Sequence, residues 1–319
     1  MNWRKIILSA FAAFLMLCLT ACGGAKQVTK NGFWFDTYVT MTVYGSEETI
    51  EKAVGICEHY DLLLDRFDER SDIFKINNAH GASVTVDKDT AEIIALGLYY
   101  SELSDGIFDI TCGAETSLWN FNDENAIIPD EQTRNNAVKL VDYTQVKIDG
   151  CSVTVPDGVQ LDLGGIAKGY VADKIVEMLK ENGVSNALLS LGGNIYSMGS
   201  KSGENWRIGI KSPDGGFAGV YAPDKDISVV TSGDYERYFI RDGIRYHHIL
   251  DLKNAMPAQT DVRSVTILSP SSAKCDALST ICFVLGSERA TELIKSMDDT
   301  EAIFILADGS MIQTRNVLK

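Results

Sequence analysis

The stretch from Leu161 to Asp173, LDLGGIAKGYVAD, constrains the fold of this chain more than any other. Its first three residues alternate apolar and acidic side chains, which predicts the end of a β-strand. A helix is predicted to open at Gly165 and to end near Gly183. Such a strand–glycine–helix junction leaves backbone N–H groups free, and adjacent glycines let a ligand approach the main chain. An anionic group such as phosphate suits this place, although glycines at a junction equally serve tight packing.

The N-terminal segment has the pattern of an export signal. Arg4 and Lys5 precede an apolar run from Ile6 to Leu19, which is shorter than the ~20 residues that a membrane-spanning helix needs. The following LTAC, which ends at Cys22, resembles a bacterial lipoprotein cleavage box with its lipid on Cys22. We therefore expect a signal peptide at 1–21, a lipid-anchored tether at 22–31 and a folded domain at 32–319, exported and held at the membrane. The alternative is an ordinary signal peptide with an incidental cysteine.

The charge balance limits the partners of the chain. There are 44 Asp and Glu against 29 Lys and Arg, a formal net charge of −15. This excess argues against nucleic acid or anionic lipid head groups as partners. It also requires any phosphate site to gather positive charge locally, from backbone dipoles, a few basic side chains or a bound metal ion. The cysteines after Cys22 are odd in number and form no CxxC pair, which argues against a disulfide framework.

The order of predicted elements favours a mixed fold. Further helices are predicted from Ser46 to about Leu64, Thr90 to Leu103, Ser271 or Ser272 to Leu285, and Ser287 to about Met297. Strands are predicted at Val39–Tyr44, Ala187–Leu191, Trp206–Ile210, Ile227–Val230, Tyr246–Leu250, Val265–Leu268 and Ala302–Leu306. Strands outnumber crossover helices in the second half. This favours an α/β (α+β) fold with mixed, largely antiparallel sheets and packed helices. The polar stretch Asn120–Asn136 is interpreted as a long loop between two lobes.

Asp276 and Thr280 are candidate metal ligands. They lie four residues apart and so share one face of the predicted helix. A carboxylate and a hydroxyl are hard oxygen ligands that Mg²⁺ accepts together with phosphate oxygens and water. A polar stripe on a solvated helix is the commoner explanation of such a pair. Here, however, the neighbouring residues are apolar, and two oxygen groups on an apolar helix need a partner.

Four other segments carry candidate functional side chains. His247 and His248 point to opposite faces if they lie on a strand, so only one can face a cleft as a general base; a core or surface histidine is the alternative. Arg237 lies in the segment 231–238, TSGDYERY, which follows a predicted strand. Its side chain is suited to bind phosphate or to pair with a carboxylate. Phe67 and Phe108 could stack on a planar ring system or pack in the core.

Taken in order, these segments resemble the ApbE family, the FAD:protein FMN transferases. The motifs that carry the resemblance are FDTYVTMTVYG, RFDERSDIFKIN, GIFDITCGA, LDLGGIAKGYVAD, NALLSLGGNI, TSGDYERYF, HHILD and DALST, between about Phe33 and Gly286. The resemblance implies a T-fold-like α/β fold with FAD held in a cleft between lobes. It also implies Mg²⁺-dependent cleavage of FAD, with FMN attached to a Thr or Ser of a target flavoprotein and AMP released.

The resemblance implies specific residue roles. Asp276, Thr280 and the backbone oxygen of Ala167 would hold Mg²⁺, and His248 would act at the reacting phosphate. The implied FAD contacts are Phe35, Phe67, Phe108, Asp109, Ile110, Asp162, Gly164, Gly165, Lys168, Tyr170 and Leu250. Two departures from the family pattern stand out: Phe35-Asp36 replaces the usual Met-Gly, and the loop after Asp251 lacks the usual Pro and Gly.

Three hypotheses follow. The first is a membrane-tethered FMN transferase that acts on an exported or membrane flavoprotein. The second is an FAD pyrophosphatase that makes FMN and AMP, and the third is a flavin-binding lipoprotein without catalysis. The Asp276–Thr280 pair argues against pure binding, because a carrier needs no metal ion at the pyrophosphate. Nothing in the sequence separates transfer from hydrolysis.

Overall fold

The computed structural model describes residues 26–318, except 122, 124 and 125. The predicted signal peptide and the predicted lipid site at Cys22 lie outside the described residues. Among the helices that are described, none combines the length and the apolar character needed to cross a membrane.

The larger lobe is built on an eight-stranded antiparallel sheet. In spatial order its strands are β1 (Gln27–Trp34), β2 (Thr37–Tyr44), β6 (Ala187–Leu191), β7 (Asn194–Met198), β12 (Ile227–Gly233), β17 (Val262–Ser269), β18 (Glu301–Leu306) and β19 (Met311–Gln313). Their inward side chains form the main core with the helices. The prediction of an α/β fold with largely antiparallel sheets is confirmed.

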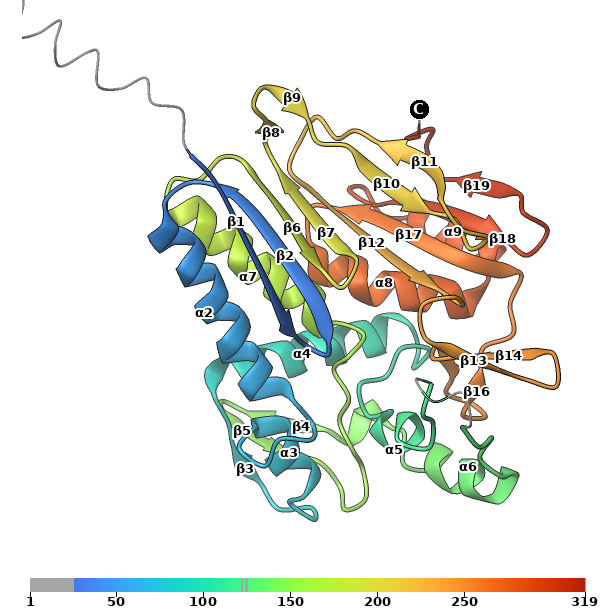
Figure 1. The fold of residues 1–319 in the computed structure, drawn as a ribbon. Helices are drawn as coiled ribbons and strands as arrows, with labels where there is room; N and C mark the ends of the chain where they lie inside the picture. Colours follow the sequence, from blue (N-terminus) through green and yellow to red (C-terminus); the bar gives the residue numbers. More distant parts are fainter. Residues whose placement is uncertain (1–25, 122, 124–125, 319) are drawn as a thin grey trace, which may run out of the picture.

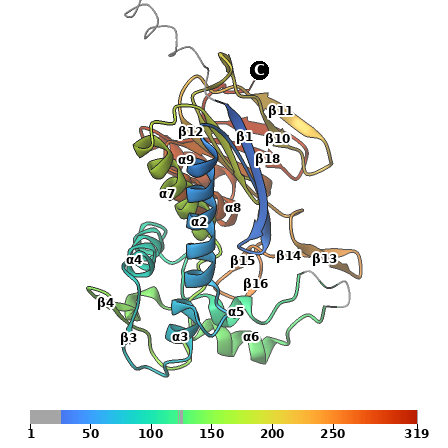
Figure 2. The ribbon, with the colours of Figure 1, turned by 60° about the vertical axis from the view of Figure 1, so that its left-hand side comes forward.

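Helices cover one face of this sheet. They are α2 (Glu47–Leu64), α7 (Ala167–Glu181), α8 (Ser272–Leu285) and α9 (Ser287–Lys295). On the other face lies the hairpin of β10 (Ile208–Lys211) and β11 (Phe217–Tyr221), as Figures 1 and 2 show. Ile208 and Ile210 of this hairpin pack against Val229 and Leu268 of the sheet. The central strands β12, β17 and β18 are therefore largely buried on both faces, whereas β1 and β2 carry exposed side chains such as Phe33 and Tyr38.

The smaller lobe lies below the sheet in Figure 1. It contains α3 (Asp72–Asn77), α4 (Lys88–Leu103), α5 (Gly113–Thr116), α6 (Glu131–Val138), η1 (Tyr143–Gln145) and the sheet of β3 (Val84–Thr85), β5 (Ser152–Thr154) and β4 (Lys147–Asp149). Three short hairpins complete the fold: β8 (Ser200–Lys201) with β9 (Glu204–Asn205), β13 (Tyr238–Arg241) with β14 (Ile244–His247), and β15 (Leu250–Asp251) with β16 (Met256–Pro257).

The starts of α2 and α8 follow their capping residues. The Ser46 hydroxyl accepts a hydrogen bond from the Thr49 N–H at 3.1 Å, and Ser271 accepts one from Lys274 at 3.3 Å. A side-chain oxygen at the N-cap satisfies an amide that the helix itself cannot. Asp173 of α7 adds to this at α8, because its carboxylate accepts hydrogen bonds from the N–H groups of Ser272 and Ala273 at 2.7 and 3.0 Å.

Several predicted elements differ from the structure. Leu161–Leu163 belongs to no strand, and α7 begins at Ala167, later than Gly165. The Asn77 side chain takes the place of a strand partner, since its amide donates to the Leu161 carbonyl at 3.0 Å and accepts from the Leu161 N–H at 2.7 Å. The predicted loop Asn120–Asn136 contains the start of α6. That helix buries only Ala137, so it has little apolar periodicity to detect.

Other boundaries shift for local reasons. Strand β1 begins at Gln27, inside the segment predicted to be a tether, because it pairs along its whole length with β2. Gly286 is the N-cap of α9, and Ser287 is its first residue. The predicted strand Trp206–Ile210 begins only at Ile208. The predicted strand Tyr246–Leu250 is divided between β14 and β15 by His248 and Ile249. The cleft expected between the lobes stays a prediction.

Candidate functional site

The bend before α7 is held by contacts on both sides. Asp162 accepts a hydrogen bond from the Gly164 N–H at 2.9 Å, and Lys168 donates to the Gly164 carbonyl at 3.0 Å. Gly165 lies against Phe108, where an added Cβ would come within 2.8 Å of the ring. The first residue of the helix is Ala167, and its N-cap, Ile166, has no side-chain hydrogen bond. The bend is therefore held on both sides, and the helix that follows it has no side-chain cap at its N-cap residue.

Some of the amide groups predicted to be free are used within the chain. Those of Ile166 and Ala167 donate to the Leu163 carbonyl at 3.0 and 2.9 Å. The N–H groups of Gly165 and Lys168 have no hydrogen-bond partner in the described part of the chain. Two backbone donors and the Lys168 ammonium thus remain at this helix start for an anion.

Asp276 lies directly beside this helix start. Its side chain is buried, and one carboxylate oxygen, Oδ2, accepts a hydrogen bond from the Gly169 N–H at 2.9 Å. The same oxygen lies 3.8 Å from the Lys168 ammonium. This approach is possible because residue 169 is glycine: an added Cβ would lie 2.3 Å from the Ser272 carbonyl oxygen of α8. The expected proximity of Asp276 to the glycine bend is therefore observed.

The metal ligands implied by the resemblance suit a divalent cation. The second oxygen of Asp276, Oδ1, has no hydrogen-bond partner among the described residues, so it can bind an ion. Thr280 follows one turn later on the same face of α8 and is half-buried. Ala167, whose backbone oxygen is the third implied ligand, is the first residue of α7. Hard oxygen donors of this kind are what Mg²⁺ accepts in proteins. Their joint coordination of an ion stays a prediction.

His247 and His248 lie in different environments, as strand alternation predicts. His247 is buried against the ring of Phe283, with 5.4 Å between ring centroids. His248 is half-buried after the end of β14, and its Nδ1 lies 3.3 Å from the Arg237 carbonyl oxygen. Burial, followed by the positive charge of Arg237, lowers the pKa of His248 to about 4. Lys168 contributes in the same direction, which places His248 within electrostatic range of the α7 start.

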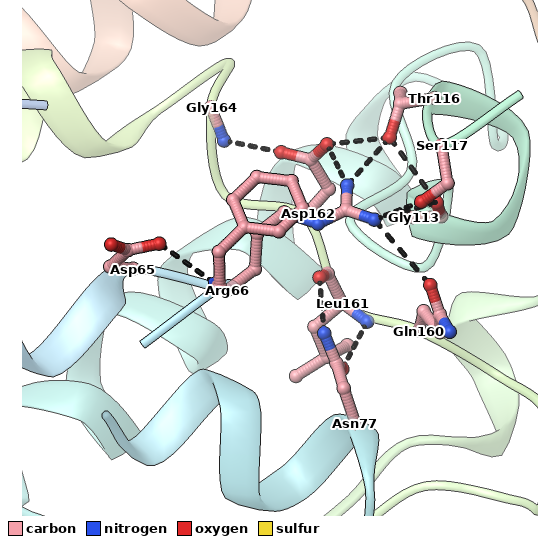
Figure 3. A network of polar contacts seen from close by, with 11 residues as sticks. Asp65, Arg66, Asn77, Gly113, Thr116, Ser117, Gln160, Leu161, Asp162 and Gly164 are labelled. Carbon is pink, nitrogen blue, oxygen red and sulfur yellow. Dashed lines mark hydrogen bonds and ion pairs between the residues drawn. The ribbon is translucent and has the colours of Figure 1, made fainter. Parts of the chain in front are cut away.

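A polar network that sequence reasoning missed holds Asp162 (Figure 3). Arg66 donates to Oδ2 of Asp162 at 2.6 Å, and the Thr116 hydroxyl donates to the same oxygen at 2.7 Å. Arg66 also donates to the Gly113 carbonyl at 2.9 Å. Burial opposes the charge of Asp162, but Arg66, Thr116 and the Gly164 N–H lower its pKa overall. Both oxygens of Asp162 are engaged, so its observed role is to connect α2, α5 and the bend.

The three phenylalanines predicted at the site differ in exposure. Phe67 is 75% exposed and lies under the Arg66 guanidinium, 5.2 Å from the ring centroid. Phe35 is half-buried in the β1–β2 turn, and its N–H donates to Asp61 at 2.6 Å. Phe108 is buried under Gly165. Phe67 and Phe35 can therefore present ring surface to a ligand without rearrangement of the core, whereas Phe108 supports the glycine bend.

Four other predicted contacts are occupied by the protein itself. Asp109 is buried and accepts hydrogen bonds from Thr111 and from the Tyr143 N–H; burial raises its pKa. Ile110 is fully buried. The ring of Tyr170 packs edge-on against Tyr60 of α2 at 5.6 Å. Leu250 lies in an apolar cluster with Trp119 and Phe239. Direct ligand contact by these four residues stays a prediction.

A surface hollow lies beside Tyr60, the ring partner of Tyr170. It has a volume of about 460 Å³ and is lined by His59, Tyr60, Asp89 and Lys174, among others. None of the predicted site residues lines it. The candidate site therefore rests on the contact of Asp276 with the start of α7 and on Lys168 beside it.

Known proteins resemble this chain in sequence and in fold. The model of the ApbE family matches residues 35–304. A protein of Treponema pallidum named FAD:protein FMN transferase is 36% identical over 92% of this chain and 89% of its own length. The solved ApbE protein of Thermotoga maritima is 34% identical, with a TM-score of 0.83 over 91% of this chain and 97% of its own. The apo form of Pseudomonas stutzeri flavinyl transferase ApbE is 28% identical, with a TM-score of 0.81 over 92% of this chain and 96% of its own. The chain belongs to the ApbE family.

Proposed function

We propose that the protein is an enzyme that transfers FMN from FAD to a Thr or Ser hydroxyl of a flavoprotein and releases AMP. The relatives named FAD:protein FMN transferase support the transfer of flavin. The observation that carries the proposal for this chain is the position of Asp276, whose carboxylate reaches the Gly169 N–H beside two unpartnered backbone donors. An acidic protein can hold a diphosphate at such a place because the negative charge is offset locally.

The residues of the chain divide the work of this reaction. The Lys168 ammonium and the N–H groups of Gly165 and Lys168 would bind the diphosphate. Asp276, Thr280 and the Ala167 carbonyl would hold Mg²⁺, which when bound supplies charge neutralisation at the phosphate oxygens. Phosphoryl transfer asks the protein mainly for positioning and for such neutralisation.

The bonds and protons of the step balance as follows. The acceptor hydroxyl oxygen forms a bond to the phosphorus of the FMN half. The bond from that phosphorus to the bridging oxygen breaks, and AMP leaves with the bridging oxygen. His248 would receive the hydroxyl proton, since its low pKa leaves the imidazole neutral at physiological pH. AMP leaves as a phosphate monoester anion, so its departure requires no general acid.

We also propose that the protein is exported and anchored by lipid on Cys22, so that its acceptor is an exported or membrane flavoprotein. The support is the sequence of residues 1–22 alone.

The function is tested by incubating the purified protein with FAD, MgCl₂ and a candidate acceptor flavoprotein domain. Release of AMP together with an FMN-sized mass gain on the acceptor is expected. AMP without the mass gain would favour the pyrophosphatase, and unchanged bound FAD would favour the carrier.

Asp276→Ala should reduce AMP formation to background while the protein remains folded. Asp157→Ala, at an exposed carboxylate that pairs only with His80, is the matched control and should keep full activity. Equal turnover in both variants would refute the assignment of Asp276.

A further inference from the structure

The hairpin of β13 and β14 protrudes from the body of the protein (Figure 1). Its strands are joined by the tight turn at Asp242–Gly243, where both residues have positive φ, 53° and 76°. One face of the hairpin, formed by Phe239 and Tyr246, stacks on the aromatic cluster around Trp119. The hairpin is therefore held firmly on one face only.

The outer edge of β13 has unpaired backbone groups. The His248 N–H donates to the Arg237 carbonyl at 3.1 Å, so Arg237 and His248 form a hydrogen-bonded pair. Hydrogen-bonded pairs alternate along an antiparallel ladder. The N–H and C=O groups of Tyr238 and Ile240 consequently point away from β14. No third strand pairs with β13 in the part of the chain that the structure describes. Such an edge is a template for an added strand.

The same edge is apolar. Ile240 is 57% exposed and Tyr238 is 37% exposed, on the face opposite Phe239. The Arg245 guanidinium covers one side of the Tyr238 ring at 4.5 Å and pairs with Asp234 at 2.9 Å, which fixes the orientation of the ring. Exposed branched apolar side chains on an open edge favour association, and soluble proteins usually protect such edges.

The edge leads toward the reacting centre. An added strand that runs along β13 from Ile240 to Arg237 would span about three residues, or about 10 Å. Arg237 is paired with His248, and its charge acts on the His248 imidazole. A hydroxyl carried about three to four residues beyond the residue that contacts Ile240 would therefore arrive level with Arg237, on the side opposite to its partner His248. The hydroxyl substrate is the one reactant in the proposed function that must come from another protein.

We propose that the outer edge of β13, at Tyr238 and Ile240, binds an extended segment of the acceptor flavoprotein as an added β-strand. This inference rests on the proposed transferase function. The segment has an apolar residue that packs on Tyr238 and Ile240, with the accepting Thr or Ser about three to four residues away. Backbone hydrogen bonds to the edge supply affinity that is independent of sequence, and the apolar contact sets the register.

Steady-state transfer of FMN to the acceptor domain tests the surface. Ile240→Ser should raise the KM for the acceptor about tenfold, the effect of losing part of one buried apolar side chain, with the FAD affinity unchanged. The matched control is Phe217→Ser on β11, which is 71% exposed but lies on the hairpin that covers the other face of the sheet. It should leave both constants unchanged.

Amide exchange provides a second measurement on the unaltered protein. The N–H groups of Tyr238 and Ile240 should exchange at least tenfold more slowly in the presence of saturating acceptor domain, whereas those of β11 should not change. An unchanged KM in Ile240→Ser, or unchanged exchange at both amides, would refute the docking edge while leaving the transferase function intact. Failure of the unaltered protein to transfer FMN at all would overturn the proposed function itself, and the docking edge with it.

Discussion

Glu115 is a buried carboxyl group without a partner, and it makes the stability of the protein depend on pH. The side chain lies in α5, is fully buried, and neither carboxyl oxygen has a hydrogen-bond partner among the described residues. Burial, followed by the negative charges of Asp251 and Asp109, raises its pKa from 4.5 to about 8. A carboxyl group in this position is therefore neutral in the folded protein at neutral pH.

The size of the effect follows from the pKa. In the unfolded chain the group ionises near pH 4.5, and in the folded protein only near pH 8. Between these values the folded state binds one more proton than the unfolded state, so the free energy of unfolding decreases as pH rises. A difference of one in pKa corresponds to about 1.4 kcal/mol. Between pH 5 and pH 8.5 this residue alone should cost about 4 kcal/mol of stability.

Glu115→Gln isolates this contribution, because glutamine has nearly the same shape and does not ionise. At pH 5 the two proteins should have similar stability, since both carry a neutral polar side chain at this place. At pH 8.5 the variant should be the more stable by about 4 kcal/mol. Glu131→Gln at the exposed start of α6 is the control, and its effect should be the same at both pH values.

Urea unfolding followed by circular dichroism at both pH values measures the difference. Comparing the variant with the unaltered protein at each pH removes the contribution of all other titrating groups. If the stability difference between them changes by less than about 1 kcal/mol from pH 5 to pH 8.5, the buried, uncharged state of Glu115 is refuted.

Three further predictions concern the site and the anchor. His248→Ala should lower kcat for FMN transfer at least a hundredfold with little change in FAD binding. The unaltered protein should keep its kcat/KM for FAD well below pH 6, because the pKa of His248 is about 4. A fall in kcat/KM on the acid side near pH 6.5 would contradict this. Gly169→Ala should destabilise the protein by about 2 kcal/mol or more, measured by urea unfolding, because its Cβ would lie 2.3 Å from the Ser272 carbonyl oxygen. Cys22→Ala should move the protein from the membrane fraction to the soluble fraction after cell lysis, and retention in membranes would refute lipid attachment at this residue.

Elements specified by neighbouring residues were predictable from the sequence. Helix α2 starts after Ser46 and ends at Leu64 as expected, because its cap and its apolar face lie within the helix segment. Strand β6 occupies the predicted residues Ala187–Leu191, a short apolar run whose partners β2 and β7 lie on both sides. Local capping and apolar periodicity are the signals that sequence reasoning reads best.

Features that depend on distant residues were not predictable. The extended Leu161–Leu163 segment has strand-like alternation, but the Asn77 side chain, 84 positions away, takes the place of a strand partner. The Arg66–Asp162 ion pair joins residues 96 positions apart, and a single arginine near an aromatic residue gives no signal of such a partner. Glu115 also escapes prediction, since nothing in the sequence around it indicates burial of a carboxyl group without a partner.

The most informative stretch of the sequence combines helix packing with the groups proposed to bind the ligand. Gly169 lies against the Ser272 carbonyl and Asp173 caps α8, so these two residues fix α8 against α7, while Gly165 packs the bend before α7 on Phe108. That same contact brings Asp276 to the Gly169 N–H and leaves one carboxylate oxygen open. The two interpretations of the glycines, tight packing and anion binding, are therefore not alternatives. Close packing of the helices is the cause of the donor arrangement, and a change that separates α7 from α8 must weaken both stability and ligand binding.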